Sequence, residues 1–494
     1  MTDHLSMHTA TRAHPGARRA WPALPAWVAV GLLAGCSQFQ PYERPATALP
    51  SSWPVAPAAL PVASATTNAA AATDPSAVTA PAAWSALVTD PALRTLVEQA
   101  LQNNRDARIA SLQVAQVRAQ YQIRDAARWP TINLGLTGSR QTVGENEPIK
   151  STLTGGLQVA GWELDLFGRV ESLKEVALAQ YLASEETRRS THLSLAAAVV
   201  SGWLNLQASD ALLALTRQTL ASREEALRLT QLRLRHGAAS ALDLRLAESL
   251  TESARVALAQ QQRQRMLDRH ALALLVGQPV DQPLPEAATG TPDAPDAAWQ
   301  ALADVPVGVP STVLLNRPDI RAAEQQLAAA QAQMGAARAA FFPRVSLTAS
   351  VGSASSELSG LFKGGTWGWA LAPQALLPIF DGGANRAGLE SAQAGRDLAL
   401  AQYEKAIQVA FREVNDALAS RGTLEAQLTA QQGLVQAETE RLRLSELRLR
   451  QGVASQLEVL DAQRSLFAAR QALLQVRFAL AQNRVALFKA TAGI

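Results

Sequence analysis

The stretch LSELRLRQGVASQLEV, Leu444 to Val459, occurs twice in related form in this chain of 494 residues. Its counterpart is LTQLRLRHGAASALDL, Leu229 to Leu244, and matching residues lie 215 positions apart. In both copies a glycine suits a reversal of the chain after one helix, and a serine three residues later can cap the next helix. The two stretches therefore predict two helical hairpins, one in each half of the chain.

Other landmarks recur at nearly the same spacing and extend the similarity over most of the chain. They are Asn104-Arg105 with Asn316-Arg317, Pro130 with Pro343, and Phe167 with Phe380. A repeat of this length is a duplicated half rather than a solenoid unit of about 20–50 residues. We expect two structural repeats, each with the order helix, two strands, long helix, turn, return helix.

Each predicted hairpin begins with a long helix that carries an apolar residue at every seventh position. A strict seven-residue period imposes a left-handed supercoil on neighbouring helices. The first long helix, Arg169 to Arg235, covers 67 residues, or about 100 Å at 1.5 Å per residue. That length is about three times the thickness of a bilayer core, so the helix is not built for a compact domain. The heptad positions are Leu206, Leu213, Leu220, Leu227 and Leu234, and in the second half Leu428, Val435, Leu442 and Leu449.

Two segments of alternating character follow the two repeated prolines. PTINLGLTG begins at Pro130 and PRVSLTASVG at Pro343, and polar or glycine-rich loops, Ser139–Lys150 and Ser353–Gly365, separate each from a partner segment. One-sided alternation over about 10 residues is typical of a lipid-facing barrel wall. A soluble hairpin with one face on a core would show the same alternation, so the pattern leaves both interpretations open.

Four strands cannot close a barrel within one chain, because the smallest membrane barrels have about eight. A barrel wall would therefore need several copies of this chain. The strands thus imply an oligomer in which each chain contributes a few strands and several helices to shared walls.

The only cysteine of the chain, Cys36, closes an amino-terminal leader. Basic residues precede an apolar run, Trp21 to Gly35, which is the order of a secretory signal and is too short to span a bilayer. Leu33-Ala34-Gly35-Cys36 has the form of a lipobox, the cleavage site of a bacterial lipoprotein. An ordinary signal peptide with an incidental cysteine is the alternative. We expect residues 1–35 to be removed and Cys36 to carry lipid, and Ser37 after it favours the outer membrane.

These observations divide the chain into five parts. We expect a lipoprotein signal peptide at 1–35, a lipidated N-terminus with an extended Ala/Pro-rich segment at 36–89, and a linker at 284–315, which the family resemblance described below makes an equatorial linker. The first repeat covers 90–283, with Asp90 as its first helix cap, strands at about 130–167 and a helical hairpin at about 169–277. The second repeat covers 316–494, with strands at about 343–380 and a hairpin at about 384–490.

Composition and motifs exclude two classes of function. Removal of residues 1–35 lowers the formal charge from +3 to +1, and no basic tract remains, which argues against a nucleic-acid partner. The three histidines of the mature chain share no local motif, and no HExxH, GxSxG or GxxxxGK sequence is present, which argues against an enzyme. Charged residues on the long helices, such as Arg223, Glu224 and Glu225, are interpreted as solvated faces or helix pairs.

Several longer motifs together resemble one protein family. They are PYERP at Pro41, WELDLFGR at Trp162, NRPDIRAAE at Asn316, AARAAFFPRVSLTAS, LPIFDGG, FREVNDAL and GVASQLEVLDAQRSLF at Gly452. With the lipobox they resemble the outer-membrane factors of tripartite efflux systems, TolC-like channels of the OprM-like lipoprotein branch. The resemblance implies a mixed α and β membrane protein: a trimeric 12-stranded outer-membrane β-barrel, continued by a 12-helix periplasmic α-barrel, with an equatorial domain.

The resemblance also implies a function and its partners. Such proteins are passive conduits that export drugs, toxic compounds or metal ions, and an inner-membrane pump, here of the resistance-nodulation-division type, supplies the energy. A periplasmic membrane-fusion adaptor joins the pump to the tunnel tip. No cofactor is expected beyond the lipid on Cys36. A coiled-coil outer-membrane lipoprotein without a pore is the alternative that the heptads alone would allow.

Two groups of residues are expected to carry the function. The family motif SQLEVLDAQ implies that Leu457 and Asp461 form apolar and acidic rings of a periplasmic gate, whereas periodicity alone would make Leu457 a coiled-coil core residue. Because loops often carry function, we expect the hairpin turns to dock the adaptor, although the same residues could serve turn geometry only. The docking tips are Arg235, His236, Gly237, Ala238, Ala239 and Ser240, with Arg450, Gln451, Gly452, Val453, Ala454 and Ser455.

Overall fold

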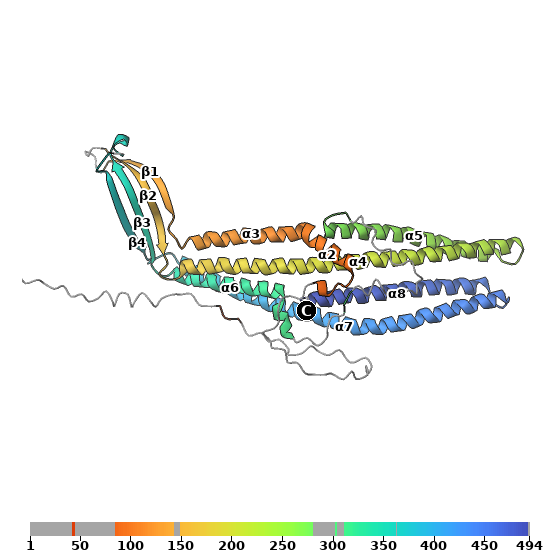
Figure 1. Cartoon of the computed structure of the whole chain (residues 1–494). Coiled ribbons are helices and arrows are strands. Elements are labelled where there is room, and N and C mark those ends of the chain that lie inside the picture. The colour runs from red at the N-terminus through yellow and green to blue at the C-terminus, as the bar shows by residue number, and fades with distance from the viewer. Residues whose placement is uncertain are drawn as a thin grey trace, which may run out of the picture. The chain divides into compact units, whose positions relative to one another are not determined.

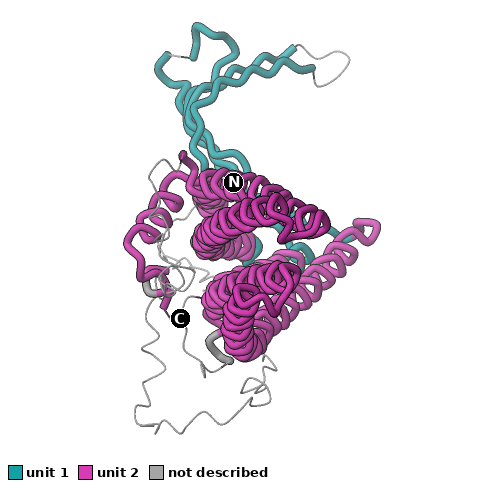
Figure 2. Tube along the Cα trace, turned by 90° about the vertical axis from the view of Figure 1, so that its right-hand side faces the viewer, with its two compact units in different colours: residues 1–39, 130–169, 338–379 teal, residues 40–129, 170–337, 380–494 magenta. Residues whose placement is uncertain are grey.

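The computed structural model describes residues 42–44, 84–142, 149–279, 302–303, 311–361 and 363–492 (Figure 1). The predicted leader, the lipobox at Cys36 and most of the linker at 284–315 lie outside the described residues. Among the described residues, one compact unit contains the strands, at 130–169 and 338–379 (Figure 2). The other contains almost all of the helical residues.

The strand unit is built on a single antiparallel sheet of four strands in the order β1-β2-β3-β4. The strands are β1 (Ile132–Gln141), β2 (Lys150–Leu164), β3 (Arg344–Ser355) and β4 (Trp367–Leu376). The ladder between β2 and β3 joins the two halves of the chain, with Leu157 opposite Val351. Both outer strands, β1 and β4, pair on one side only within the described sheet.

The register gives the sheet one apolar and one polar face. Residues directly opposite one another in an antiparallel pair share a face. The row Leu134, Leu157, Val351 and Trp369 therefore lies on one face, and the row Asn133, Gln158, Ser350 and Ala370 on the other. The apolar face is exposed, since 83% of Leu134 and 77% of Trp369 are accessible. A soluble hairpin with this face on a core, the alternative left open by the alternation, is therefore wrong.

The strands are longer than the sequence pattern predicts at their loop ends. β1 continues through Gln141 and β3 through Ser355, so the predicted loops, Ser139–Lys150 and Ser353–Gly365, begin inside the ladder. Polar pairs continue the pairing there: the hydroxyls of Ser353 and Thr366 lie 2.5 Å apart. Serine and threonine give no clear apolar/polar alternation, so the alternating pattern ends before the strands do.

The other ends of β2 and β3 are tied by a charged cluster. Glu163 accepts two hydrogen bonds from Arg169, at 2.7 and 2.6 Å, and a third from Arg344 at 2.8 Å. Phe167 and Phe342, from the two halves of the chain, stack nearby with ring centroids 5.0 Å apart. Residues from the two halves therefore meet where the sheet ends.

The described part of the first half contains four α-helices. They are α2 (Pro91–Asn103), α3 (Arg105–Ala126), α4 (Arg169–Arg235) and α5 (Ala241–Val276), after the short 3-10 helix η2 (Trp84–Ala86). The predicted cap is confirmed, since Asp90 accepts from the amides of Ala92 and Leu93. The single helix expected between Asp90 and the first strand is interrupted at Asn104, which ends α2 and caps α3. The side chain of Asn104 also donates to the Leu275 carbonyl. A tertiary contact to α5 thus stabilises the break.

The second half supplies α6 (Pro318–Ala339), α7 (Ala384–Arg450) and α8 (Gln456–Ala490), with 3-10 helices η4 (Ser311–Asn316) and η5 (Leu358–Gly360). α4 and α7 are each 67 residues long, the length predicted for the first of them. The heptad seam is present in the second hairpin, where Val435 of α7 is buried with Leu466 and Leu473 of α8, and Leu428 and Leu442 pack against them. None of the described helices is long and apolar enough to cross a membrane.

The main core of the helical unit draws on both halves of the chain. Its largest fully buried side chains include Trp203 of α4 and Tyr403 of α7. Arg317 lies at the edge of this core, 5% exposed, and donates to Asp319, Glu413 and the carbonyl of Ala490. The start of α6, the middle of α7 and the end of α8 are thereby joined at one guanidinium group.

The described amino-terminal residues, 42–44, dock on the same unit. Arg44 donates two hydrogen bonds of 2.6 Å to the carboxylate of Glu324 on α6, whose side chain is only 9% exposed. Burial, together with the nearby charge of Glu324, raises the pKa of Tyr42 to about 12. The segment that follows the predicted lipid anchor is therefore fixed to the second half of the chain.

Candidate functional site: the hairpin tips

The first hairpin reverses in a turn built from backbone and capping bonds. Gly237 follows α4 with φ +71°, and a Cβ there would meet nothing within 4 Å, so glycine is needed for the backbone rather than for space. The amide of Ala238 donates to the Arg233 carbonyl at 2.8 Å. Ser240 and Asp243 then form a reciprocal capping box at the start of α5, and the bonds from Ser240 lower the pKa of Asp243.

The second hairpin repeats this turn with different side chains. Gly452 has φ +74°, and the amide of Val453 donates to the Arg448 carbonyl at 3.0 Å. Ser455 caps α8 by accepting from the amide of Glu458 at 3.4 Å. All twelve predicted docking residues are exposed except Ala239 and Ala454, which are partly buried. The turns can therefore present their side chains to a partner, and their glycines also serve turn geometry.

Leu457 and Asp461 lie together on the second hairpin. Both line a hollow of about 910 Å³ that also includes Leu444 and Ser445 of α7. Leu457 is 55% exposed, so it is not part of the buried seam between α7 and α8. Its counterpart in the first hairpin, Leu242, is also exposed, at 77%. The structure therefore brings the two candidate gate residues to one accessible surface of α8.

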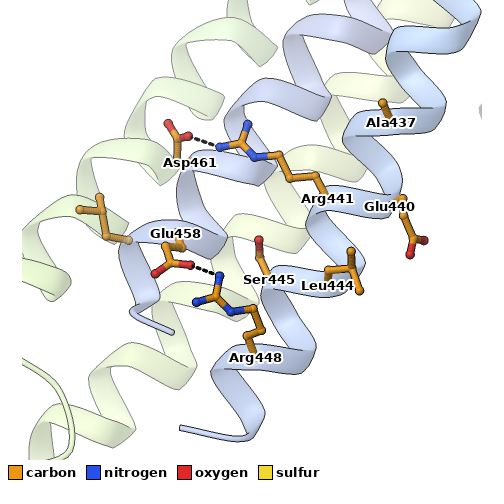
Figure 3. Close-up of a pocket in the computed structure, with 9 residues that line it drawn as sticks. Ala437, Glu440, Arg441, Leu444, Ser445, Arg448, Glu458 and Asp461 are labelled. Atoms are coloured by element: carbon orange, nitrogen blue, oxygen red, sulfur yellow. Dashed lines mark hydrogen bonds and ion pairs between the residues drawn. The ribbon is translucent and has the colours of Figure 1, made fainter. Parts of the chain in front are cut away.

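Asp461 is held by two arginines that sequence reasoning missed. Arg441 of α7 donates to it at 2.6 Å (Figure 3), and Arg464 of α8 also donates at 2.6 Å. The hydrogen bond from Arg441 is the main reason why the pKa of Asp461 is lowered. One helical turn nearer the tip, Arg448 of α7 pairs with Glu458 of α8 at 3.2 Å. The carboxylate of Asp461 is thus ionised and already neutralised within its own chain at neutral pH.

These partners had only a weak signal in the sequence. Arg464 lies three residues after Asp461, a spacing at which helical side chains meet. Arg441 and Asp461 lie at comparable distances on either side of the turn at Gly452, so an antiparallel hairpin brings them to the same height. Neither pattern distinguishes an ion pair from two solvated charges until the rotation of each helix is known.

One interpretation of the long helices is wrong. Arg223 is 6% exposed rather than solvated: it donates to the Leu250 carbonyl at 2.8 Å, and its guanidinium carbon lies 5.5 Å from the ring centroid of Phe467. Burial lowers its pKa. Because α4 packs on both α5 and α8 at this level, a position that looks polar in the sequence is covered. Glu224 and Glu225 pair with arginines, as the sequence indicates.

Ionisable groups elsewhere do not gather into a metal site. Within the described ranges, no group of three or more His, Cys, Asp and Glu side chains could hold a metal ion.

Arg233 donates to Gln456 at 3.0 Å, which joins the end of α4 to the start of α8. The two tips are therefore in contact within one chain.

Comparison with known proteins identifies the family. The profile described as "Outer membrane efflux protein" matches residues 96–278 and 309–493. The chain is 43% identical over 468 residues to the toluene efflux pump outer membrane protein TtgC of Pseudomonas putida, covering 94% of this chain and 93% of that one. It is 42% identical over 467 residues to the outer membrane protein OprJ of Pseudomonas aeruginosa, covering 93% of each.

A solved structure agrees with these matches. The open-state crystal structure of the MtrE outer membrane channel of Neisseria gonorrhoeae has a TM-score of 0.79 and 36% identity, covering 93% of this chain and 98% of that one. The predicted mixed α and β channel fold is therefore confirmed at that level. The chain belongs to the outer membrane efflux protein family, and it is an efflux component of the bacterial outer membrane rather than an enzyme.

Proposed function

We propose that the chain is one subunit of a trimeric, passive conduit that crosses the outer membrane as a 12-stranded barrel. The observation that carries this proposal is the open four-stranded sheet, with unpaired outer edges on β1 and β4 and an exposed apolar face. Pairing β4 of one chain with β1 of the next satisfies both edges, and three copies close a ring. A coiled-coil spacer without a pore would not require a sheet with unpaired edges and an exposed apolar face.

The dimensions of the sheet support a membrane crossing. β4 has 10 residues, which is about 30 Å of strand and about 25 Å of height at the usual tilt. The apolar band of outer-membrane barrels is about 25 Å tall and is bordered by aromatic residues. Trp367 and Trp369 stand near one end of the apolar face, and Trp162 near the other. The polar face then lines a water-filled bore.

The helices support a tunnel built from three chains. α4 and α7 are single long helices, and α3 with α5 and α6 with α8 supply two more helical rows, so three chains provide 12. Several apolar side chains on α3 and α5 are exposed in one chain, where a neighbouring subunit would cover them. They include Ile109, Leu112, Ile123, Val256, Met266 and Leu274. Each half of the chain contributes one long helix and one further helical row, as the duplicated sequence predicts.

We further propose that Leu457 and Asp461 close the resting channel at its periplasmic tip. Their shared, accessible surface on α8 supports this assignment. Three leucines around an axis would resist wetting, and the ion pairs of Asp461 with Arg441 would hold α8 against α7. The first hairpin has Leu246 in place of Asp461, so the acidic ring would come from the second hairpin only.

Assembly with partners completes the proposal. The efflux-pump names of the relatives support an adaptor and an inner-membrane pump as partners. The adaptor would dock on the hairpin turns, and the pump would be of the resistance-nodulation-division type, as the family resemblance implies. The pump supplies the energy and selects the substrate. A lipid on Cys36 would anchor the amino terminus, and the ion pair of Arg44 with Glu324 would fix the chain to the helical unit eight residues after that cysteine.

Single-channel conductance in a planar bilayer tests the conduit and its gate. Purified wild type should conduct, and Leu457→Ala or Asp461→Ala should raise conductance or open probability. Leu242→Ala, at the matching position of the first hairpin, is the control and should leave both unchanged. If neither the wild type nor either gate variant conducts, the conduit is refuted. Normal trimers whose conductance is unaffected by both gate substitutions would refute the gate alone.

A further inference from the structure

Both hairpin tips end in the same pattern of basic residues. The last turn of α4 carries Arg233 and Arg235, and the last turn of α7 carries Arg448 and Arg450. Arg235 and Arg450 are exposed, occupy equivalent positions in the two halves, and are the outermost cations of their helices. The two tips therefore repeat one exposed cation in the same place.

The carboxylates of the tips are already engaged within the chain. Asp243 accepts from the amide and hydroxyl of Ser240, at 3.0 and 2.7 Å, and Glu458 pairs with Arg448 at 3.2 Å. Among the described residues, no carboxylate forms an ion pair with Arg235 or Arg450. The Nε of Arg450 reaches only the backbone carbonyl of Glu446, at 3.4 Å. The charge of both guanidinium groups is therefore left unneutralised by its own chain.

Two exposed arginines at equivalent positions earlier on the same helices do have partners. Seven residues earlier on the same helices, Arg228 pairs with Glu225 and Arg443 with Glu440, each at 2.7 Å. These two pairs are also equivalent between the halves, and their arginines are 62% and 60% exposed. A basic residue near a helix C-terminus interacts favourably with the helix dipole. Arg233 and Arg448 already supply that interaction, so it does not account for the second cation.

We propose that Arg235 and Arg450 form the ionic contacts of the docking tips and that the adaptor presents carboxylate side chains to them. This inference rests on the proposed function, because it names the chemistry of the partner at the tips. Each cation is followed along the chain by an exposed apolar side chain: Leu242, seven residues after Arg235, is 77% exposed, and Val453, three residues after Arg450, is 66% exposed. An acidic residue next to an apolar contact on the adaptor tip would complement each tip in both charge and polarity. Equivalent cations allow one adaptor to use both tips in the same way.

Binding of the purified cognate periplasmic adaptor to the immobilised full-length trimer tests this inference. The Arg235→Gln/Arg450→Gln double variant should bind about tenfold more weakly at low salt, because each trimer loses six exposed charge contacts. Its affinity should depend less on salt than that of the wild type, since exposed charges are screened within about 10 Å at 0.1 M. Arg235→Lys/Arg450→Lys should retain most of the affinity, and Arg235→Glu/Arg450→Glu should lose more than the Gln variant.

The Arg228→Gln/Arg443→Gln double variant is the matched control. It removes cations of similar exposure that are already neutralised, so adaptor affinity and its salt dependence should stay at the wild-type level. Wild-type affinity in the Arg235→Gln/Arg450→Gln variant would overturn the inference, as would an equal loss in the control. Failure of the wild type to bind the adaptor would also overturn it. That outcome is distinct from a failure of the conduit itself, which appears as loss of conductance without any adaptor present.

Discussion

Replacement of Arg317 by methionine removes a buried cation that joins three helices. The Arg317 side chain is 6% exposed. One nitrogen donates to Asp319 at 2.7 Å and to Glu413 at 2.8 Å, and another donates to the Ala490 carbonyl at 2.9 Å. Methionine preserves most of the apolar stem and removes all of these bonds. The change therefore isolates the contribution of the guanidinium group to packing of α6, α7 and α8.

The expected cost follows from what the substitution leaves behind. Breaking a buried ion pair costs about 3–5 kcal/mol when an uncompensated charge stays buried. Here Asp319 and Glu413 remain 42% and 38% exposed, so water can solvate them and the cost is reduced. The Ala490 carbonyl loses its donor, which adds about 1–3 kcal/mol. We expect a loss of local stability of about 3 kcal/mol in total.

Removing the two carboxylates instead of the cation should cost more stability than Arg317→Met. Asp319→Asn with Glu413→Gln leaves the cation of Arg317 buried without a counter-charge, which moves the cost towards about 5 kcal/mol. Arg317→Lys keeps the charge and loses the planar fork, so its cost should be smaller than that of methionine. The order of the three variants tests whether the buried cation, rather than the carboxylates, dominates the energetics.

Hydrogen exchange of the purified trimer measures this stability locally. Peptides that cover 311–321 and 485–492 should exchange about 100-fold faster in Arg317→Met, since 1.4 kcal/mol corresponds to a factor of ten. Arg412→Met is the control, because Arg412 is 71% exposed and pairs only weakly with Asp416 at 3.8 Å. Exchange in Arg317→Met within threefold of the wild type would refute the reasoning.

Acid should reduce the difference between Arg317→Met and the wild type. Burial alone would raise the pKa of Asp319, but the hydrogen bond and charge of Arg317 outweigh it, and the pKa lies below its ordinary value of 3.8. A carboxyl with a depressed pKa in the folded state contributes stability above its unfolded pKa, and this contribution is lost as the pH falls through the folded value. The variant lacks this contribution, so the two curves should converge below about pH 4. Curves that stay parallel well below about pH 4, where Asp319 becomes protonated in the folded wild type, would contradict the assignment.

Three further predictions concern the amino terminus and the orientation of the chain. Intact mass of membrane-extracted protein should show acylated Cys36 and no residues 1–35, and an unmodified thiol would contradict the lipobox. An impermeant maleimide added to whole cells should label Glu145→Cys and not Ala239→Cys, because the proposed channel would have its strand loops outside the cell and its helical turns in the periplasm; the reverse labelling would invert this topology. Arg44→Gln should lower trimer melting by only a few degrees and increase protease cleavage near the amino terminus, because Glu324 stays buried without its 2.6 Å partner; unchanged cleavage would mean that this ion pair does not hold the segment.

Local features of the fold were readable from the sequence because they depend on neighbours along the chain. A glycine and a serine three residues apart identify each hairpin turn, and the structure has Gly237 and Gly452 in left-handed conformations there. The heptad pattern predicts the 67-residue helix, which begins and ends at the expected residues. Among the candidate functional residues, the exposure of the turns followed from the same local pattern.

Only the tertiary structure decided which surfaces meet. Alternation predicts two strand pairs but cannot tell that β2 and β3, from opposite halves, join them into one sheet with an exposed apolar face. Helix periodicity likewise cannot give the rotation of one helix against another, which buries Arg223 under Phe467 and brings Arg441 to Asp461. Periodicity reports which residues share a face of one element, whereas contacts between distant elements depend on the packing of the whole chain. For that reason the turns were found from the sequence, and the ion pairs beside the candidate gate were not.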